Sequence, residues 1–346
     1  MDRTIYRFDQ LPMSASTGQA PGRSGQGIGA ARRDAPRIGV IYNPRSHRNK
    51  GQDLECTERP DITVAQPRER EDIAAALAAF AADGIDYLII NGGDGTVRDV
   101  LTMGQGVFGD AWPALAILPK GKTNALNVDL GAPPGWNLPD AIAAFANGKR
   151  IVRRPLSVAR EGGGEPPMLG FIFGAGAFTL GIETGQDAHA LGFFNSLAVG
   201  ATGAWGVMQA LFGSDANKWR RGTEMSLAYL PSGEPVERSA HGDPARRSLL
   251  LASTLAKMPL DIKLFAPDGD GIKLALLDKP RRRILASVPA ILLGWRPDWL
   301  AGAGFHQLSA HAFSLDVGEP VILDGEAFPA GRYLIGQGPE LTFVTP

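Results

Sequence analysis

Short apolar runs alternate with stretches of helical periodicity between residues 37 and 150. Runs of this length bounded by turn residues predict buried strands at 38–42, 61–64, 87–90 and 114–118. Between the second and third runs, Ile73, Leu77 and Phe80 recur at helical spacing as far as Gly84, which predicts an amphipathic helix. Strands that alternate with helices are typical of an open parallel α/β sheet.

The pattern changes after about residue 150, where short β-type runs are separated by glycine-rich turns. This pattern predicts a mainly antiparallel β-sandwich domain. We therefore expect an α/β domain followed by a β domain, with these limits: a flexible tail, 1–36; the α/β domain, 37–150; the β-sandwich domain, 151–318; and a C-terminal segment able to pack back on the first domain, 319–346.

A glycine-rich loop lies between the third predicted strand and the helix that follows it. It contains Gly92, Gly93, Asp94, Gly95 and Thr96. Glycine lets the backbone approach a ligand closely, and a helix N-terminus offers unpaired N–H groups to an anion. A carboxylate and a hydroxyl at the same place suit magnesium and phosphate oxygen. The loop predicts a phosphate site, and an ordinary turn with Asp94 and Thr96 as helix caps is the simpler alternative.

Two other polar loops follow predicted strands of the same sheet. Asn43-Pro44 closes the first strand, and Gly121-Lys122-Thr123-Asn124 follows the fourth. In open α/β sheets the ligand crevice lies beyond the carboxyl ends of the strands. We therefore expect the three loops to meet at one edge of the sheet.

Composition and charge narrow the function classes. The chain has 346 residues, 44% apolar and 21% charged, with a net charge of −1, so it offers no overall basic field and we expect no nucleic-acid partner. Cys56 is the only cysteine, which excludes an internal disulfide and fits the cytoplasm. The basic runs, including Arg281-Arg282-Arg283, suit solvated surface or an anionic membrane.

An uncharged stretch from Ala190 to Ser214 is long enough to span a bilayer. Because it contains five glycines and two amides, we expect a buried or lipid-facing amphipathic element in preference to a transmembrane helix.

Four motifs in order give the chain a family resemblance: Asn43-Pro44, Gly92–Thr96, Pro119-x-Gly121-x-x-Asn124 and Asp324-Gly325-Glu326. The chain resembles the diacylglycerol kinase catalytic-domain family, which includes bacterial lipid kinases and sphingosine kinases. The resemblance implies a nucleotide-binding α/β domain, a lipid-binding β-sandwich domain, and transfer of the γ-phosphoryl group of ATP to a lipid hydroxyl with Mg²⁺. It also implies a lipid substrate at a membrane surface and peripheral membrane association. It implies no stable protein partner, and a homodimer stays open.

The resemblance assigns roles by position. The nucleotide would be held by Asn43, Pro44, Gly92, Gly93, Asp94, Gly95, Thr96, Gly121, Lys122, Thr123 and Asn124. Glu326 would accept the proton of the lipid hydroxyl, with Asp324 beside it and Asp94 close to the phosphates and metal. Asp270, in an Asp-Gly turn, would be the candidate for a structural metal site; an acidic turn without metal is the alternative.

The chain departs from the family pattern in the third motif. Lys122 stands where the family usually has threonine, and Ala125 replaces an acid. A lysine can contact phosphate as a point charge, which would leave the site altered instead of lost. Two alternatives stay open: an NAD kinase-like enzyme, which shares the glycine–aspartate loop, and a pseudokinase that binds lipid or nucleotide. Residues 116–123 nearly spell a P-loop, but they begin with alanine inside an apolar strand.

Overall fold

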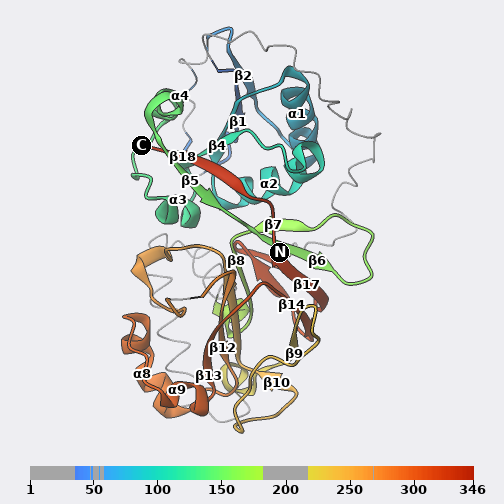
Figure 1. Cartoon of the computed structure of the whole chain (residues 1–346), viewed down its shortest axis with the longest axis vertical. Coiled ribbons are helices and arrows are strands. Elements are labelled where there is room, and N and C mark those ends of the chain that lie inside the picture. The colour runs from blue at the N-terminus through green and yellow to red at the C-terminus, as the bar shows by residue number, and fades with distance from the viewer. Residues whose placement is uncertain (1–35, 47, 50–53, 55–57, 182–216, 268) are drawn as a thin grey trace. The chain divides into compact units, whose positions relative to one another are not determined.

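The computed structural model describes residues 36–46, 48–49, 54, 58–181, 217–267 and 269–346. Residues 1–35 of the predicted tail (1–36) and the uncharged stretch Ala190–Ser214 lie outside the described residues. The described chain divides into two compact units (Figure 1): residues 36–153 together with 339–346, and residues 154–338. Each unit is described by itself.

The unit of 36–153 and 339–346 is built on a six-stranded sheet in the order β2-β1-β3-β4-β18-β5. Strands β1 to β4 pair in parallel, which confirms the predicted open parallel sheet. Figure 1 shows β18, from the end of the chain, lying between β4 and β5; it runs parallel to β4 and antiparallel to β5. The strands are β1 Ile38–Tyr42, β2 Ile62–Ala65, β3 Tyr87–Gly92, β4 Ala114–Pro119, β5 Lys149–Arg153 and β18 Leu341–Thr345.

Helices cover both faces of this sheet. They are α1 Arg70–Asp83, α2 Asp94–Phe108, α3 Ala125–Leu130 and α4 Leu138–Asn147. The α1 side chain Phe80 lies so close to Gly39 of β1 that a Cβ there would be 2.8 Å from its ring. On the opposite face, Ile38, Val40 and Ile89 pack with Leu138 and Ala141 of α4 in one buried cluster.

The unit of 154–338 contains two antiparallel six-stranded sheets, as the predicted sandwich requires. Their orders are β10-β9-β14-β17-β6-β7 and β13-β12-β11-β8-β15-β16. The rings of Phe173 in one sheet and Tyr333 in the other meet edge to face at 6.3 Å. The strands are β6 Leu156–Arg160, β7 Met168–Gly170, β8 Ile172–Gly176, β9 Thr223–Tyr229, β10 Arg246–Arg247, β11 Leu249–Ser253, β12 Ile272–Leu277, β13 Phe305–Ala310, β14 Ala312–Val317, β15 Val321–Leu323, β16 Glu326–Phe328 and β17 Gly331–Gln337.

Two helices pack on the second of these sheets. Ile284 and Ile291 of α8 and Leu300 of α9 share a buried cluster with Ala275 and Phe305. The helical segments of this unit are α7 Lys218–Arg221, a 3₁₀ turn Pro259–Asp261, α8 Arg282–Leu292 and α9 Trp299–Ala303.

A buried charge cluster lies beside this core. The Asp278 carboxylate, with no exposed side-chain surface, lies 3.0 Å from Arg247 Nη1 and 2.9 Å from His306 Nε2. It also accepts hydrogen bonds from the backbone N–H and the hydroxyl of Ser239, at 2.8 and 2.9 Å. Burial by itself would raise the pKa of Asp278. The bonds from His306 and Ser239 and the charge of Arg247 outweigh it and lower the pKa below its ordinary value.

None of the helices in the described part of the chain is both long enough and apolar enough to cross a membrane.

Candidate active site

The glycine loop and the loop after β4 lie back to back. A Cβ on Gly93 would come within 2.9 Å of the Cα of Gly121, and the reverse distance is 2.8 Å. A Cβ on Gly92 would lie 2.5 Å from the Cβ of Thr96. Since real Cβ atoms do not approach this closely, a side chain at Gly93 or Gly121 would push the two loops apart, and one at Gly92 would displace Thr96.

Asp94 joins the two loops. Its carboxylate oxygens accept hydrogen bonds from the backbone N–H groups of Asn124 at 2.9 Å and Ala125 at 3.0 Å. Burial raises the pKa of Asp94, and these two bonds act in the opposite direction. The carboxylate therefore fixes the start of α3 against the start of α2.

Asn124 closes the second loop. Its backbone is left-handed, with φ 52°, a conformation that asparagine tolerates better than other non-glycine residues. Its side chain accepts from Gly121 N at 2.7 Å and donates to Gly121 O at 3.0 Å. The buried amide thus holds the turn that carries Lys122 and Thr123, both of which are exposed.

Asn43 connects the loop after β1 to the glycine loop. Its Nδ2 donates to the hydroxyl of Thr96 at 2.8 Å, and its Oδ1 accepts from the N–H of Arg45 at 2.9 Å. Pro44 follows at the exposed surface of the same turn. The structure thus brings the predicted loop residues together at the carboxyl ends of β1, β3 and β4.

The start of α2 fits a phosphate group. Gly93 provides no side-chain cap for this 15-residue helix, and a Cβ on Gly95 would meet nothing within 4 Å. Uncapped N–H groups and the helix dipole favour an anion at this place. Exposed Arg45, Arg48 and Lys122 lie on the neighbouring turns and add positive charge.

The sequence places Asn91, near the end of β3, directly before the glycine loop but gives it no role of its own. The residue is fully buried, and neither polar atom of its amide has a hydrogen-bond partner among the described residues. Its backbone carbonyl accepts from Asn43 N and from Asn49 Nδ2. Asn91 ends an apolar run, so nothing in the pattern marks it as a buried polar residue.

Asp324 and Gly325 form the two-residue turn between β15 and β16, with φ of 48° and 84°. Positive φ at both positions is the signature of a type I′ hairpin, which Asp-Gly favours. The Asp324 carboxylate accepts from the N–H groups of Phe171 at 3.0 Å and Ile172 at 2.9 Å. These bonds pin the turn to the start of β8.

Glu326 opens β16 directly after this pinned turn and is half-buried. Asp270 is exposed in the turn before β12, and its neighbour Asp268 lies outside the described residues. Within the described ranges, no group of three or more His, Cys, Asp or Glu side chains could hold a metal ion. The roles given to Glu326, Asp324, Asp94 and Asp270 stay predictions.

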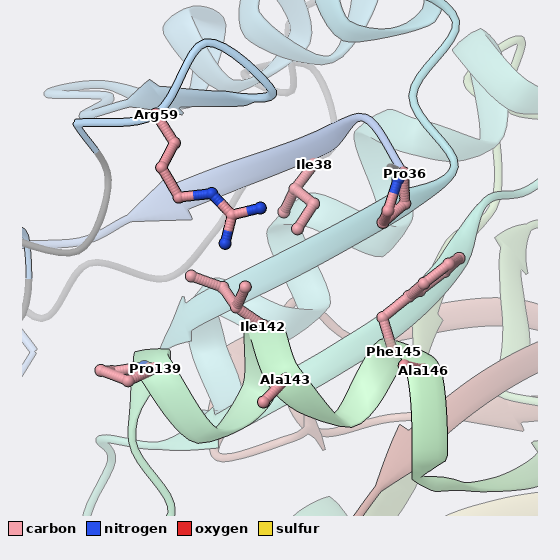
Figure 2. Close-up of a pocket in the computed structure, with 8 residues that line it drawn as sticks. All are labelled: Pro36, Ile38, Arg59, Pro139, Ile142, Ala143, Phe145 and Ala146. Atoms are coloured by element: carbon pink, nitrogen blue, oxygen red, sulfur yellow. The ribbon is translucent and has the colours of Figure 1, made fainter. Parts of the chain in front are cut away.

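A separate pocket of about 390 Å³ lies at the amino end of β1. Figure 2 shows apolar side chains of α4 and β1 around it, with Arg59 reaching over the opening. Arg59 is ion-paired with Asp61. Because the predicted loops lie at the opposite, carboxyl ends of the strands, this pocket belongs to a different place on the unit. Its lining residues are Pro36, Ile38, Arg59, Pro139, Ile142, Ala143, Phe145 and Ala146.

Residues 37–156 match the family model described as the diacylglycerol kinase catalytic domain. No curated protein matches the chain. Three solved structures from Bacillus anthracis str. Sterne are similar; they are named as diacylglycerol kinases, two of them provisionally. They share 16%, 15% and 15% identity with this chain, with TM-scores of 0.61, 0.64 and 0.60. The alignments cover 91% of this chain and 99%, 98% and 98% of theirs. At this identity the structures establish the fold, which confirms the predicted fold class.

Proposed function

Residues 37–156 belong to the diacylglycerol kinase catalytic-domain family, as the resemblance predicted, and on that premise we propose that the protein is an ATP-dependent lipid kinase. The family confirms the predicted enzyme class, a phosphotransferase with a lipid alcohol as acceptor. The proposal adds ATP as the donor, Mg²⁺ as the metal, and a diacylglycerol- or sphingoid-type lipid as the acceptor. The observation that carries it is the junction at which Asp94 ties the uncapped start of α2 to the Asn124 turn.

The phosphates of ATP would lie at the start of α2. The open space beside Gly95 and the N–H groups of a first turn without a side-chain cap suit phosphate oxygens. Lys122 and Arg48 would neutralise charge as the γ-phosphoryl group leaves, since phosphoryl transfer depends mainly on positioning and electrostatic stabilisation. Both oxygens of Asp94 already accept hydrogen bonds from backbone N–H groups. The main role of Asp94 would therefore be to hold the two loops in place.

Mg²⁺ usually keeps several waters and binds through phosphates and one or two carboxylates. A site without a preformed protein cage fits that chemistry, with Asp94 as the nearby carboxylate; the metal would neutralise phosphate charge.

Glu326 would accept the proton of the lipid hydroxyl. As that proton moves to the carboxylate, the hydroxyl oxygen forms a bond to the γ-phosphorus, and the bond from phosphorus to the leaving ADP oxygen breaks. The pinned Asp324 turn supports this role, because it fixes the backbone from which Glu326 projects.

The test is incubation of the purified protein with labelled ATP, Mg²⁺ and a panel of diacylglycerol, sphingoid bases and NAD. We expect label in a lipid. Label in NAD alone would contradict the lipid assignment in favour of the NAD kinase-like alternative, and label in no acceptor would favour the pseudokinase.

The role of Glu326 is tested in the same assay. Glu326→Gln should lower transfer by about 10²- to 10⁴-fold while ATP binding persists, because only the proton acceptor is lost. Glu161→Gln, in an exposed turn of the same unit, serves as the control. Full activity of Glu326→Gln would show that another group accepts the proton.

A further inference from the structure

We propose that the 257–263 turn and the end of α8 form a surface that inserts into an anionic lipid bilayer. The surface is defined by Leu260, Leu293 and Trp295, with the basic side chains around them. It deepens the proposed function, because a lipid hydroxyl is reached at a membrane. The geometry of the surface does not depend on the proposed function, and its binding to vesicles can be measured without ATP.

Large apolar side chains of the described chain are exposed here. Leu293 is 81% exposed, Leu260 76% and Trp295 47%. The other strongly exposed large apolar residues of the described chain are Val128, Val152 and Leu334, and they lie on separate elements. Exposed apolar residues that gather at one place mark an interaction surface, whereas scattered ones are ordinary.

Hydrogen bonds to backbone carbonyls hold the two segments side by side. Lys263 N donates to Leu292 O at 2.9 Å. The Arg296 guanidinium donates to the carbonyls of Lys263 and Phe265, at 3.1 and 2.6 Å. The tips that carry Leu260 and Leu293 are therefore parts of one surface, fixed to the buried core through Phe265 and Ile291.

Leu260 is exposed although its backbone conformation is unfavourable. Its φ is 61° and that of Asp261 is 53°, so two consecutive non-glycine residues are left-handed. That region is unfavourable for leucine because the Cβ crowds the backbone. A leucine that is both strained and exposed contributes little to folding, so its side chain is better explained by a contact outside the chain.

Aromatic and basic side chains continue the surface along α8. The rings of Trp295 and Trp299 meet at 5.9 Å, and the Arg283 guanidinium lies 3.8 Å above the Trp299 ring. Lys257 and Lys263 are exposed on the 257–263 turn, and Arg281 and Arg282 are exposed beside Arg283 at the N-terminal start of α8. The exposed acids on the neighbouring backbone are Asp261 and Asp298.

This combination fits a membrane better than a protein partner. Leucine side chains enter the acyl region, tryptophan prefers the headgroup level, and lysine and arginine attract anionic headgroups. Protein interfaces, by contrast, are depleted in lysine at their centre. The excess of basic over acidic side chains selects an anionic surface.

The test is cosedimentation of the full chain with vesicles, without ATP. One set of vesicles is phosphatidylcholine, and the other is phosphatidylcholine with an equal part of phosphatidylglycerol. We expect binding to the anionic vesicles that weakens with added salt. Leu293→Ser and Leu260→Gly should each lower the partition coefficient roughly tenfold, and Arg282→Ser roughly fivefold. Leu334→Ser, an exposed leucine on β17 of the same unit, should leave it unchanged.

Leu260→Gly also separates insertion from folding. Glycine accepts the left-handed backbone, so the melting temperature should stay unchanged or rise while vesicle binding falls. Equal binding by Leu293→Ser, Leu260→Gly and the parent chain would overturn the proposal, as would equal binding to neutral and anionic vesicles. A dimer in sedimentation equilibrium that Leu293→Ser dissociates, with vesicle binding unaltered, would assign the surface to a second copy instead.

Discussion

Asn124 combines two properties that few residues share. It adopts φ 52°, and its amide spans the turn by bonding both the N–H and the carbonyl of Gly121. Asn124→Ala should destabilise the protein by about 3 kcal/mol, because it loses both bonds and adds left-handed strain. Asn124→Gly loses the bonds without the strain, so we expect about 1–2 kcal/mol. Urea unfolding of both variants measures the difference, and equal losses would show that strain is absent.

The Asp278 cluster predicts a pH dependence. Because its folded-state pKa lies below the unfolded value of 3.8, Asp278 contributes stability above that value and loses it as pH falls through the folded-state pKa. Asp278→Asn should cost about 3–5 kcal/mol at neutral pH, since it leaves buried Arg247 unpaired. The gap from the parent chain should shrink below pH 3.8. Urea unfolding across this range is the measurement, with exposed Asp316→Asn as the control; a constant gap would contradict the assignment.

For single residues, the motifs identified those whose type and spacing in the sequence indicate their chemistry. The loops with Asn43, Asp94 and Asn124 follow strand ends, and the structure brings them together. The sequence could not reveal which oxygen meets which N–H. Asp94 and Asp324 both hold backbone N–H groups, a use that their spacing does not distinguish from metal or proton chemistry.

Among the elements, β18 shows what a linear pattern leaves open. The run 341–344 reads as a strand, but its partners lie far away in sequence. It pairs with β4 and β5, whereas β15 to β17, just before it, pair within the other unit. Apolar periodicity reports that a strand is buried, and only packing decides which sheet receives it.

Phe343 tests how strongly β18 supports its sheet. The side chain is fully buried, and its strand lies between β4 and β5 in the sheet. Phe343→Ala should destabilise the unit of 36–153 and 339–346 by about 3–5 kcal/mol, through lost burial and a residual cavity. Thr342→Ala, on the same strand and half-buried, should cost much less. Urea unfolding followed by circular dichroism measures both, and similar losses would mean that β18 is a peripheral strand.

For the whole molecule, one unit is inserted into the other along the chain. The chain leaves the first sheet after Arg153 and returns at Pro339. The sequence pattern placed the boundary between the two domains near residue 150, because helical periodicity stops there. Sequence allowed the C-terminal segment 319–346 to pack back on the first domain. In the structure β18 of that segment pairs in the first sheet, whereas β15 to β17 pair in the two sheets of the other unit.

The return point makes the first unit testable alone. Arg153 and Leu341 are directly paired in the antiparallel ladder of β5 and β18, so a two-residue Asn-Gly turn can replace residues 154–340. The shortened chain, 36–153 joined to 341–346, should unfold cooperatively in urea and bind ATP in calorimetry. It should transfer no phosphoryl group, because Glu326 is removed with the insert. Phe343→Ala in the shortened chain is the control for folding. A chain that folds without binding ATP would show that the loops held by Asp94 and Asn124 are insufficient for the nucleotide.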